Sequence, residues 1–97
     1  MNRDTIIIAD DVAVNRAILV RALQEKYNIV EAADGKETIK LISENLNRLA
    51  VILMDIKMPH IDGLQIMNLM NKKNYTKKIP IIIITGDTSE ETMRMGY

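Results

Sequence analysis

The chain has 97 residues, of which 13 are basic and 13 acidic, so its formal net charge at neutral pH is zero. This length allows one compact domain with one core and leaves no room for a second domain. The balanced charge is unlike the one-signed field of a nucleic-acid or membrane-surface binder. Cysteine is absent, which excludes disulfides, thiolate metal sites and thiol catalysis. No apolar stretch approaches membrane-spanning length, so we expect one soluble domain, most simply a cytoplasmic one.

Short apolar segments rich in isoleucine and valine alternate along the chain with segments of helical periodicity. The apolar segments predict strands covered on both faces, at residues 5–9, 28–30, 50–54 and 79–85. Between them, apolar residues at helical spacing predict three amphipathic helices, which contain Val14, Ile18, Leu19, Ala22 and Leu23, then Ile39, Ile42 and Leu46, then Leu64, Met67 and Met70. Asp34-Gly35 and Asp62-Gly63 are expected to form the turns that open the second and third helices.

Strands that alternate with helices predict right-handed crossovers and a parallel sheet between two helix layers, an α/β doubly wound fold. In such a sheet, ligands gather at the carboxyl ends of the strands. Asp10 and Asp11 follow the first predicted strand and Asp55 ends the third. Carboxylates this close repel one another unless a cation lies among them. Mg²⁺ is the expected ion because it prefers oxygen ligands and often shares its coordination with a phosphoryl group.

Each of these residues also has a structural interpretation. Asp55 alone could be a turn former or a helix cap, and Asp10 or Asp11 could be the N-cap of the first helix. A cap needs only one of the two, and the convergence of three carboxylates favours a site. His60, the only histidine, has no neighbouring ligand set with metal spacing, so we assign it no function.

Three segments together carry a resemblance to a known family: "ADD" at 9–11, "LMDIKMPHIDG" at 53–63 and "IIITGDTSEE" at 82–91. In order and spacing they resemble the receiver domain of two-component response regulators. The resemblance extends from Thr5 to the end of the chain and implies a flavodoxin-like fold. It also implies that Asp55 is the phospho-acceptor and that Asp10 and Asp11 bind Mg²⁺ together with Asp55 and the backbone carbonyl of Lys57.

The resemblance assigns further roles around the acceptor. Thr85 matches the residue whose hydroxyl contacts the phosphoryl group and moves when that group arrives. The side chain of Lys57, together with Gly86 and Asp87, matches positions that modulate the site and the lifetime of the phosphorylated state.

One departure from the family concerns the fifth strand, which in these domains ends in a lysine that pairs with the phosphoryl group, and the fifth helix. This sequence has no counterpart of either, so the expected strand order is 2-1-3-4 in a single receiver domain, residues 1–97, that is incomplete at its C-terminal end. Thr88 and Glu91 have the capping-box spacing of a helix start. An uncovered fourth strand at residues 79–85 would be a pairing edge, so we expect a homo-oligomer that forms through this edge or by exchange of the terminal segment.

The expected function is phosphorelay signal transduction rather than enzymatic turnover of a third molecule. Asp55 would take a phosphoryl group from a sensor histidine kinase or phosphotransfer protein and control an output domain that is not in this chain. No direct contact with nucleic acid or membrane is expected. Two alternatives remain, a receiver-like docking module that is never phosphorylated and a small Mg²⁺-dependent phosphohydrolase. The second would need a substrate cap, for which the chain has no long insertion.

Overall fold

The computed structural model describes residues 3–56, 58, 62–75 and 78–84. Within these ranges the chain alternates strands and helices from beginning to end. The elements are β1 (Thr5–Ala9), α1 (Ala13–Leu23), β2 (Asn28–Ala32), α2 (Gly35–Glu44), β3 (Leu49–Asp55), α3 (Gly63–Lys72) and β4 (Ile81–Ile84).

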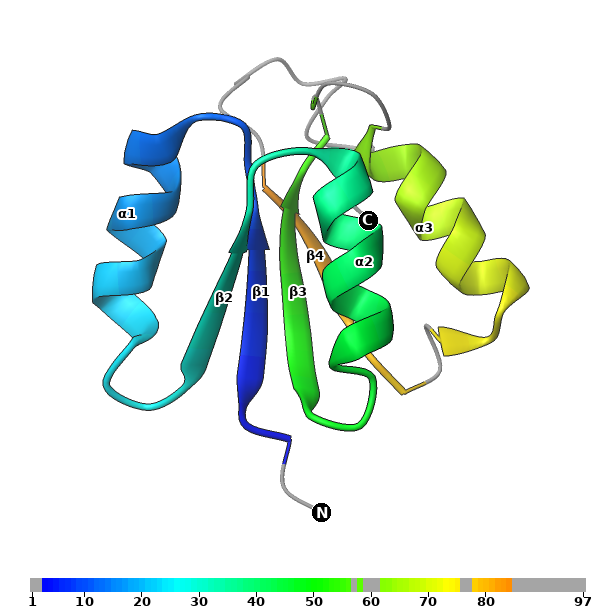
Figure 1. Cartoon of the computed structure of the whole chain (residues 1–97), viewed down its shortest axis with the longest axis horizontal. Coiled ribbons are helices and arrows are strands. Elements are labelled where there is room, and N and C mark those ends of the chain that lie inside the picture. The colour runs from blue at the N-terminus through cyan, green and yellow to red at the C-terminus, as the bar shows by residue number, and fades with distance from the viewer. Residues whose placement is uncertain (1–2, 57, 59–61, 76–77, 85–97) are drawn as a thin grey trace.

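The four strands form one parallel sheet in the order β2-β1-β3-β4. Figure 1 shows α2 in front of this sheet with α3 beside it, and α1 set apart beyond β2. β1 is the most enclosed element, since all five of its residues are buried. The predicted doubly wound α/β fold and the strand order 2-1-3-4 are confirmed.

Alternate residues of the strands supply two separate apolar cores, one on each face of the sheet. On the face covered by α2 and α3, Ile7, Ile52 and Met54 pack with Ile42 of α2 and Ile66 of α3. The opposite core is smaller. Its buried members come from β1 and β3, and α1 contributes partly buried side chains to it: Ile6, Ile8, Leu53, Leu19, Val20 and Leu23.

Aspartates begin the two helices that cover the larger core, as the sequence predicts. The Asp34 carboxylate accepts a hydrogen bond from the Glu37 backbone N–H at 2.8 Å. At α3 the arrangement is a full capping box, in which Asp62 accepts from the Gln65 N–H and the Gln65 side chain accepts from the Asp62 N–H. Each cap satisfies backbone donors that the first helical turn leaves unpaired.

The register between β1 and β3 determines which residues face each other at the upper end of the sheet in Figure 1. Thr5 is opposite Leu49, but a shift places Ile6 opposite Val51, so that Ala50 is an extra residue in β3. The strands then run in step to the pair Ala9 and Met54. Because of this bulge, the residue that follows Ala9 is in line with Asp55 and not with Met54.

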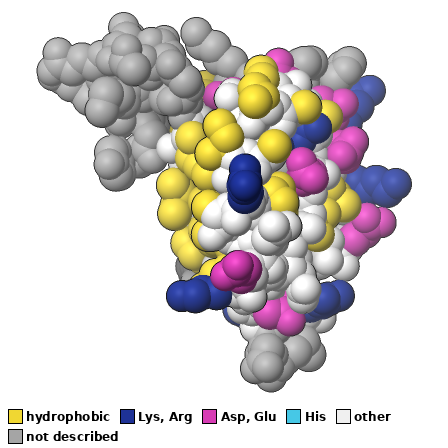
Figure 2. Space-filling view, turned by 90° about the vertical axis from the view of Figure 1, so that its left-hand side faces the viewer, with side chains coloured by type: hydrophobic (Ala, Val, Ile, Leu, Met, Phe, Trp, Pro, Cys, Tyr) yellow, Lys and Arg dark blue, Asp and Glu magenta, His cyan; other side chains and the backbone are white. Residues whose placement is uncertain are grey.

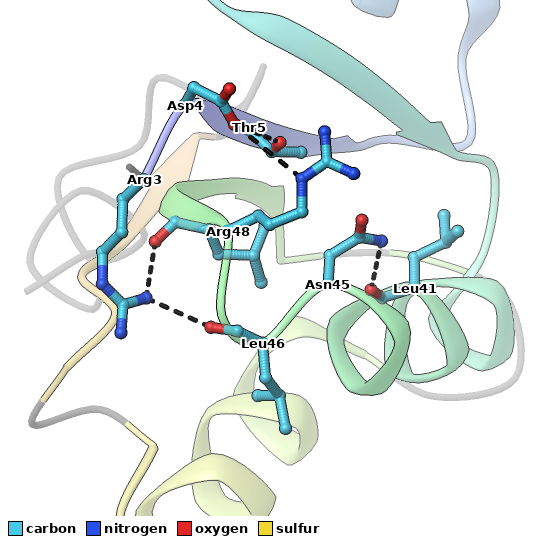
Figure 3. A network of polar contacts seen from close by, with 8 residues as sticks. Arg3, Asp4, Thr5, Leu41, Asn45, Leu46 and Arg48 are labelled. Atoms are coloured by element: carbon cyan, nitrogen blue, oxygen red, sulfur yellow. Dashed lines mark hydrogen bonds and ion pairs between the residues drawn. The ribbon is translucent and has the colours of Figure 1, made fainter. Parts of the chain in front are cut away.

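The opposite end of the sheet is fastened by polar contacts between the start of β1 and the turn from α2 to β3 (Figure 3). Arg3 Nη1 donates to the backbone carbonyls of Leu46 and Leu49 at 3.1 and 3.0 Å. Arg48 Nε lies 3.9 Å from the Asp4 carboxylate, which also accepts from the Thr5 hydroxyl. These contacts hold the turn before β3 next to the start of β1, where the pairing of the two strands begins.

The structure corrects several predicted boundaries and faces. β2 and β3 extend to Ala32 and Asp55, beyond the segments predicted, and β4 begins only at Ile81. In α3 the buried side chains are Ile66 and Met70, whereas Leu64 and Met67 are only partly buried. The start of a fourth helix at Thr88 lies outside the described residues.

The apolar face predicted for α1 is confirmed at Leu19 and Leu23, which pack against the smaller core, and wrong at the other three residues. Val14 and Ile18 are 63% and 64% exposed and Ala22 is exposed, and no residue of α1 is buried. Figure 2, which looks at the molecule from the side of α1, shows hydrophobic side chains gathered on this surface. Besides Leu19 and Leu23, the helix packs on the sheet through Val20, which was not predicted.

Candidate acidic metal and phosphoryl site

Three carboxylates meet at the carboxyl end of the sheet, where β1 and β3 end side by side. Asp10, Asp11 and Asp55 each place one carboxylate oxygen within 4.8 Å of the others. Asp10 is buried, at 7% exposure, Asp55 is partly buried and Asp11 is exposed. The structure thus brings together all three acids that the sequence placed at this edge.

Asp10 is held by hydrogen bonds on both its backbone and its side chain. Its N–H donates to the Ala32 carbonyl at 3.0 Å, which continues the pairing with β2 by one residue. Its Oδ1 accepts from the Val12 N–H at 2.9 Å. The prediction that Asp10 or Asp11 is the N-cap of α1 is wrong, because the cap residue is Val12 and no side chain caps this helix.

Asp55 ends β3 directly beneath the first residue of α3. The Gly63 N–H donates to the Ile56 carbonyl at 2.8 Å. The approach is so close that a Cβ atom on Gly63 would lie 2.7 Å from the backbone oxygen of Asp55. A glycine is therefore required here for steric reasons, and it lets α3 pack against the strand end that carries the acid.

The donor set fits Mg²⁺. This ion binds oxygen at about 2.1 Å, so two oxygens on one ion are at most about 4.2 Å apart. The 4.8 Å span of the three carboxylate oxygens needs either a small inward shift or a water between ion and carboxylate. Mg²⁺ usually keeps several of its waters, and three carboxylates without soft or nitrogen ligands suit a hard cation.

The remaining predicted site residues, Lys57, Thr85, Gly86 and Asp87, lie outside the described residues. Two residues with a structural part in the site were missed by sequence reasoning. Gly63 was assigned only to a turn, although it packs on Asp55. Arg16, whose Nη1 donates to the Asp10 carbonyl at 2.7 Å, was not singled out, because an arginine on a helix gives no signal of the contact it makes.

In a doubly wound α/β domain, the carboxyl edge of the parallel sheet is where ligands bind, and a cluster of carboxylates at that edge suits a hard metal ion. Comparison with known families narrows the class of domain. The model of the response regulator receiver domain matches residues 6–97. The chain therefore belongs to the response regulator receiver domain family, and its general function is phosphorelay signal transduction.

The chain spans well under half the length of the curated relatives that it matches. The chain is 29% identical over 97 residues to a probable cyclic di-GMP phosphodiesterase of Vibrio cholerae and spans 22% of its length. It is 34% identical over 95 residues to the CAI-1 autoinducer sensor kinase/phosphatase CqsS of Vibrio cholerae; this match covers 96% of the chain and 13% of the kinase.

Among solved structures, the chain resembles one from the CheX-CheY-BeF₃-Mg complex of Borrelia burgdorferi, with a TM-score of 0.77 and 26% identity. That match covers 94% of this chain and 68% of the other. In the part of this chain that the structure describes, no helix is long and apolar enough to cross a membrane.

Proposed function

We propose that Asp55 accepts a phosphoryl group from a phosphohistidine and that Asp10, Asp11 and Asp55 hold Mg²⁺ for this transfer. The observation that carries the proposal is the convergence of three carboxylate oxygens within 4.8 Å at the ends of two neighbouring strands. Asp55 is only partly buried, so a donor can approach it from outside.

The chemistry assigned to Asp55 is nucleophilic attack by a carboxylate oxygen on phosphorus. An O–P bond forms and the P–N bond of the phosphohistidine breaks, while the bonding electron pair stays on the imidazole nitrogen. The product is an acyl phosphate. When bound, Mg²⁺ supplies positive charge to the transferring oxygens. Asp10 and Asp11 would hold the ion through their carboxylates and Lys57 through its backbone carbonyl.

The response to phosphorylation is assigned to the segment after β4. Ile84, the last residue of β4, is opposite Asp55 in the sheet register, so Thr85 follows the residue that pairs with the acceptor. A phosphoryl group adds charge and acceptor oxygens, which the Thr85 hydroxyl is suited to contact. We assign Gly86, Asp87 and the Lys57 side chain to tuning water access, and the output to a population shift rather than enzymatic turnover.

The test is phosphorylation with a small acyl phosphate in the presence of MgCl₂, followed by mass spectrometry. The parent should gain one phosphoryl group at Asp55, and Asp55→Asn should gain none. Asp62→Asn is the matched control, because asparagine also caps helices well and Asp62 belongs to the α3 cap. Phosphoryl incorporation that persists in Asp55→Asn would assign the acceptor elsewhere. An unlabelled parent that also fails to bind beryllofluoride with Mg²⁺ would support a docking module without phosphate chemistry.

For partners, we propose a sensor histidine kinase or a phosphotransfer protein as the donor, and an output domain outside this chain. We also propose that the chain self-associates through β4 or by segment exchange. Ile82 supports this, since it is 52% exposed on β4 while its register partner Leu53 is buried. β4 pairs only with β3 among the described strands, and an apolar edge strand is a template for pairing with another chain.

A further inference from the structure

Arg16 connects three elements around the acidic site. It lies in α1, its Nη1 donates to the Asp10 carbonyl at 2.7 Å, and its Nε lies 3.1 Å from the Glu31 carboxylate on β2. The Arg16 side chain is only 17% exposed. A guanidinium is rigid and planar with five donors, so it can hold two acceptors in a fixed relative position.

The junction between β1 and α1 lacks the usual side-chain cap. Val12 is the N-cap residue and has no polar side-chain atom, and the first turn of α1 contains no acidic residue. What holds the junction instead is a pair of contacts to Asp10. The Val12 N–H donates to its carboxylate, and Arg16 donates to its carbonyl.

These contacts fix Asp10 while leaving its carboxylate able to bind a cation. An ionised carboxylate offers about four acceptor positions, and the Val12 N–H occupies one of them. The backbone of Asp10 is held from β2 through Ala32 and from α1 through Arg16. The orientation of the carboxylate toward Asp11 and Asp55 therefore depends on a backbone that Arg16 helps to hold.

We infer that Arg16 is a positioning residue of the acidic site, which holds the Asp10 backbone so that the carboxylates are arranged for Mg²⁺. This inference rests on the proposed function of Asp10, Asp11 and Asp55. Glu31 orients the guanidinium from β2, with Ile8 as its register partner on β1. Arg16 touches neither phosphoryl group nor metal in this role.

If Arg16 is replaced by a neutral residue, its charge and its positioning role predict opposite changes in Mg²⁺ affinity. Arg16 carries a positive charge next to Asp10, so its neutralisation would strengthen Mg²⁺ binding if charge alone mattered. Loss of positioning would weaken binding instead, and substitution of groups that orient metal ligands typically costs about 10- to 100-fold in metal affinity. A purely structural Arg16 would alter the unfolding midpoint and leave the Mg²⁺ affinity of the folded protein unchanged.

The experiment is an MgCl₂ titration of the chain, followed through backbone amide resonances at a temperature where circular dichroism shows each variant to be folded. Arg16→Gln should raise the Kd for Mg²⁺ about tenfold. Arg16→Lys should also raise it, because an ammonium is a point charge without the fork geometry. Arg21→Gln is the matched control, an arginine in the last turn of the same helix, and should bind like the parent.

A second measurement is made without metal. Amide exchange at Val12 should accelerate in Arg16→Gln and Arg16→Lys, because the Asp10 carboxylate that accepts from Val12 becomes less well fixed. If both Arg16 variants are folded and bind Mg²⁺ with the parental Kd or more tightly, the inference is wrong. If the parent itself binds no Mg²⁺ in the millimolar range, the proposed metal site fails, and the inference fails with it. These two results are distinguished by the parent titration alone.

Discussion

Replacing Gly63 by alanine tests the contact that joins α3 to the acceptor strand. The new Cβ would lie 2.7 Å from the Asp55 oxygen and 3.1 Å from the Ile56 Cα, both backbone atoms. Ordinary contact begins at 3.4 Å, so backbone and helix must separate by about 0.7 Å. That exceeds the tolerance of about 0.5 Å within which a functional site has to be held. We therefore expect both stability and Mg²⁺ affinity to fall.

The expected size follows from two opposing terms. Forcing an extra methyl group into a packed site lowers the free energy of unfolding by about 1–3 kcal/mol. Replacing glycine by alanine also restricts the unfolded chain, which raises the free energy of unfolding by about 0.4–1 kcal/mol. The net loss should lie between about 0 and about 2.6 kcal/mol in urea unfolding, with a central value of about 1 kcal/mol, and Tm should fall by about 4–8 °C for each kcal/mol lost.

Asp62→Ala is the control for this experiment. It removes the neighbouring α3 cap, at a cost of about 0.5–2 kcal/mol, without adding an atom against Asp55. It should lower stability by a similar amount and leave the Mg²⁺ affinity unchanged. A Gly63→Ala protein with parental stability and parental Mg²⁺ affinity would refute the claim that this close approach fixes the acceptor strand.

The other predictions concern the metal, the edge strand and the lifetime of the phosphorylated state. Asp11→Asn should weaken Mg²⁺ binding in an MgCl₂ titration, whereas Asp62→Asn should not. If both variants bind Mg²⁺ with the parental Kd, the acidic cluster is not the metal site. Ile82→Lys should shift sedimentation velocity profiles at micromolar concentration toward the monomer, because it places a charge on the exposed apolar edge; a parent that is already monomeric would remove that expectation. Asp87→Ala should change the dephosphorylation rate of Asp55 without abolishing its phosphorylation, as measured by the decay of the phosphorylated mass.

The carboxylate cluster was predictable because it depends on topology more than on detail. Each acid follows or ends an apolar strand, and parallel strands place their carboxyl ends at one edge. The order β2-β1-β3-β4 then makes the strands of Asp10 and Asp55 neighbours. The one-residue bulge at Ala50 was not predictable, because the segment at 50–54 is uniformly apolar and gives no periodicity from which to read a register.

Residues that support the acids from a distance along the chain were harder to find. Gly63 lies eight positions after Asp55 and Arg16 six positions after Asp10. Neither spacing corresponds to a local motif, since the contacts form only when α3 and α1 pack back on the strand ends. The Asp62-Gly63 pair predicts a turn, and the turn is confirmed. The close approach of Gly63 to the Asp55 backbone could not be predicted from the sequence, because it depends on how α3 packs against β3.

The buried face of α1 could be predicted only in part, because the composition of this helix offers little contrast. All of its residues except Asn15, Arg16 and Arg21 are apolar, and a helix that is apolar on most sides gives periodicity little to choose between. Polar contacts orient the helix instead, because Arg16 donates hydrogen bonds to the Asp10 carbonyl and the Glu31 carboxylate. With Arg16 held toward the sheet end, Leu19, Val20 and Leu23 reach the core while Val14 and Ile18 remain exposed. The contact that we assign to positioning the acidic site therefore also accounts for which side of α1 the protein buries.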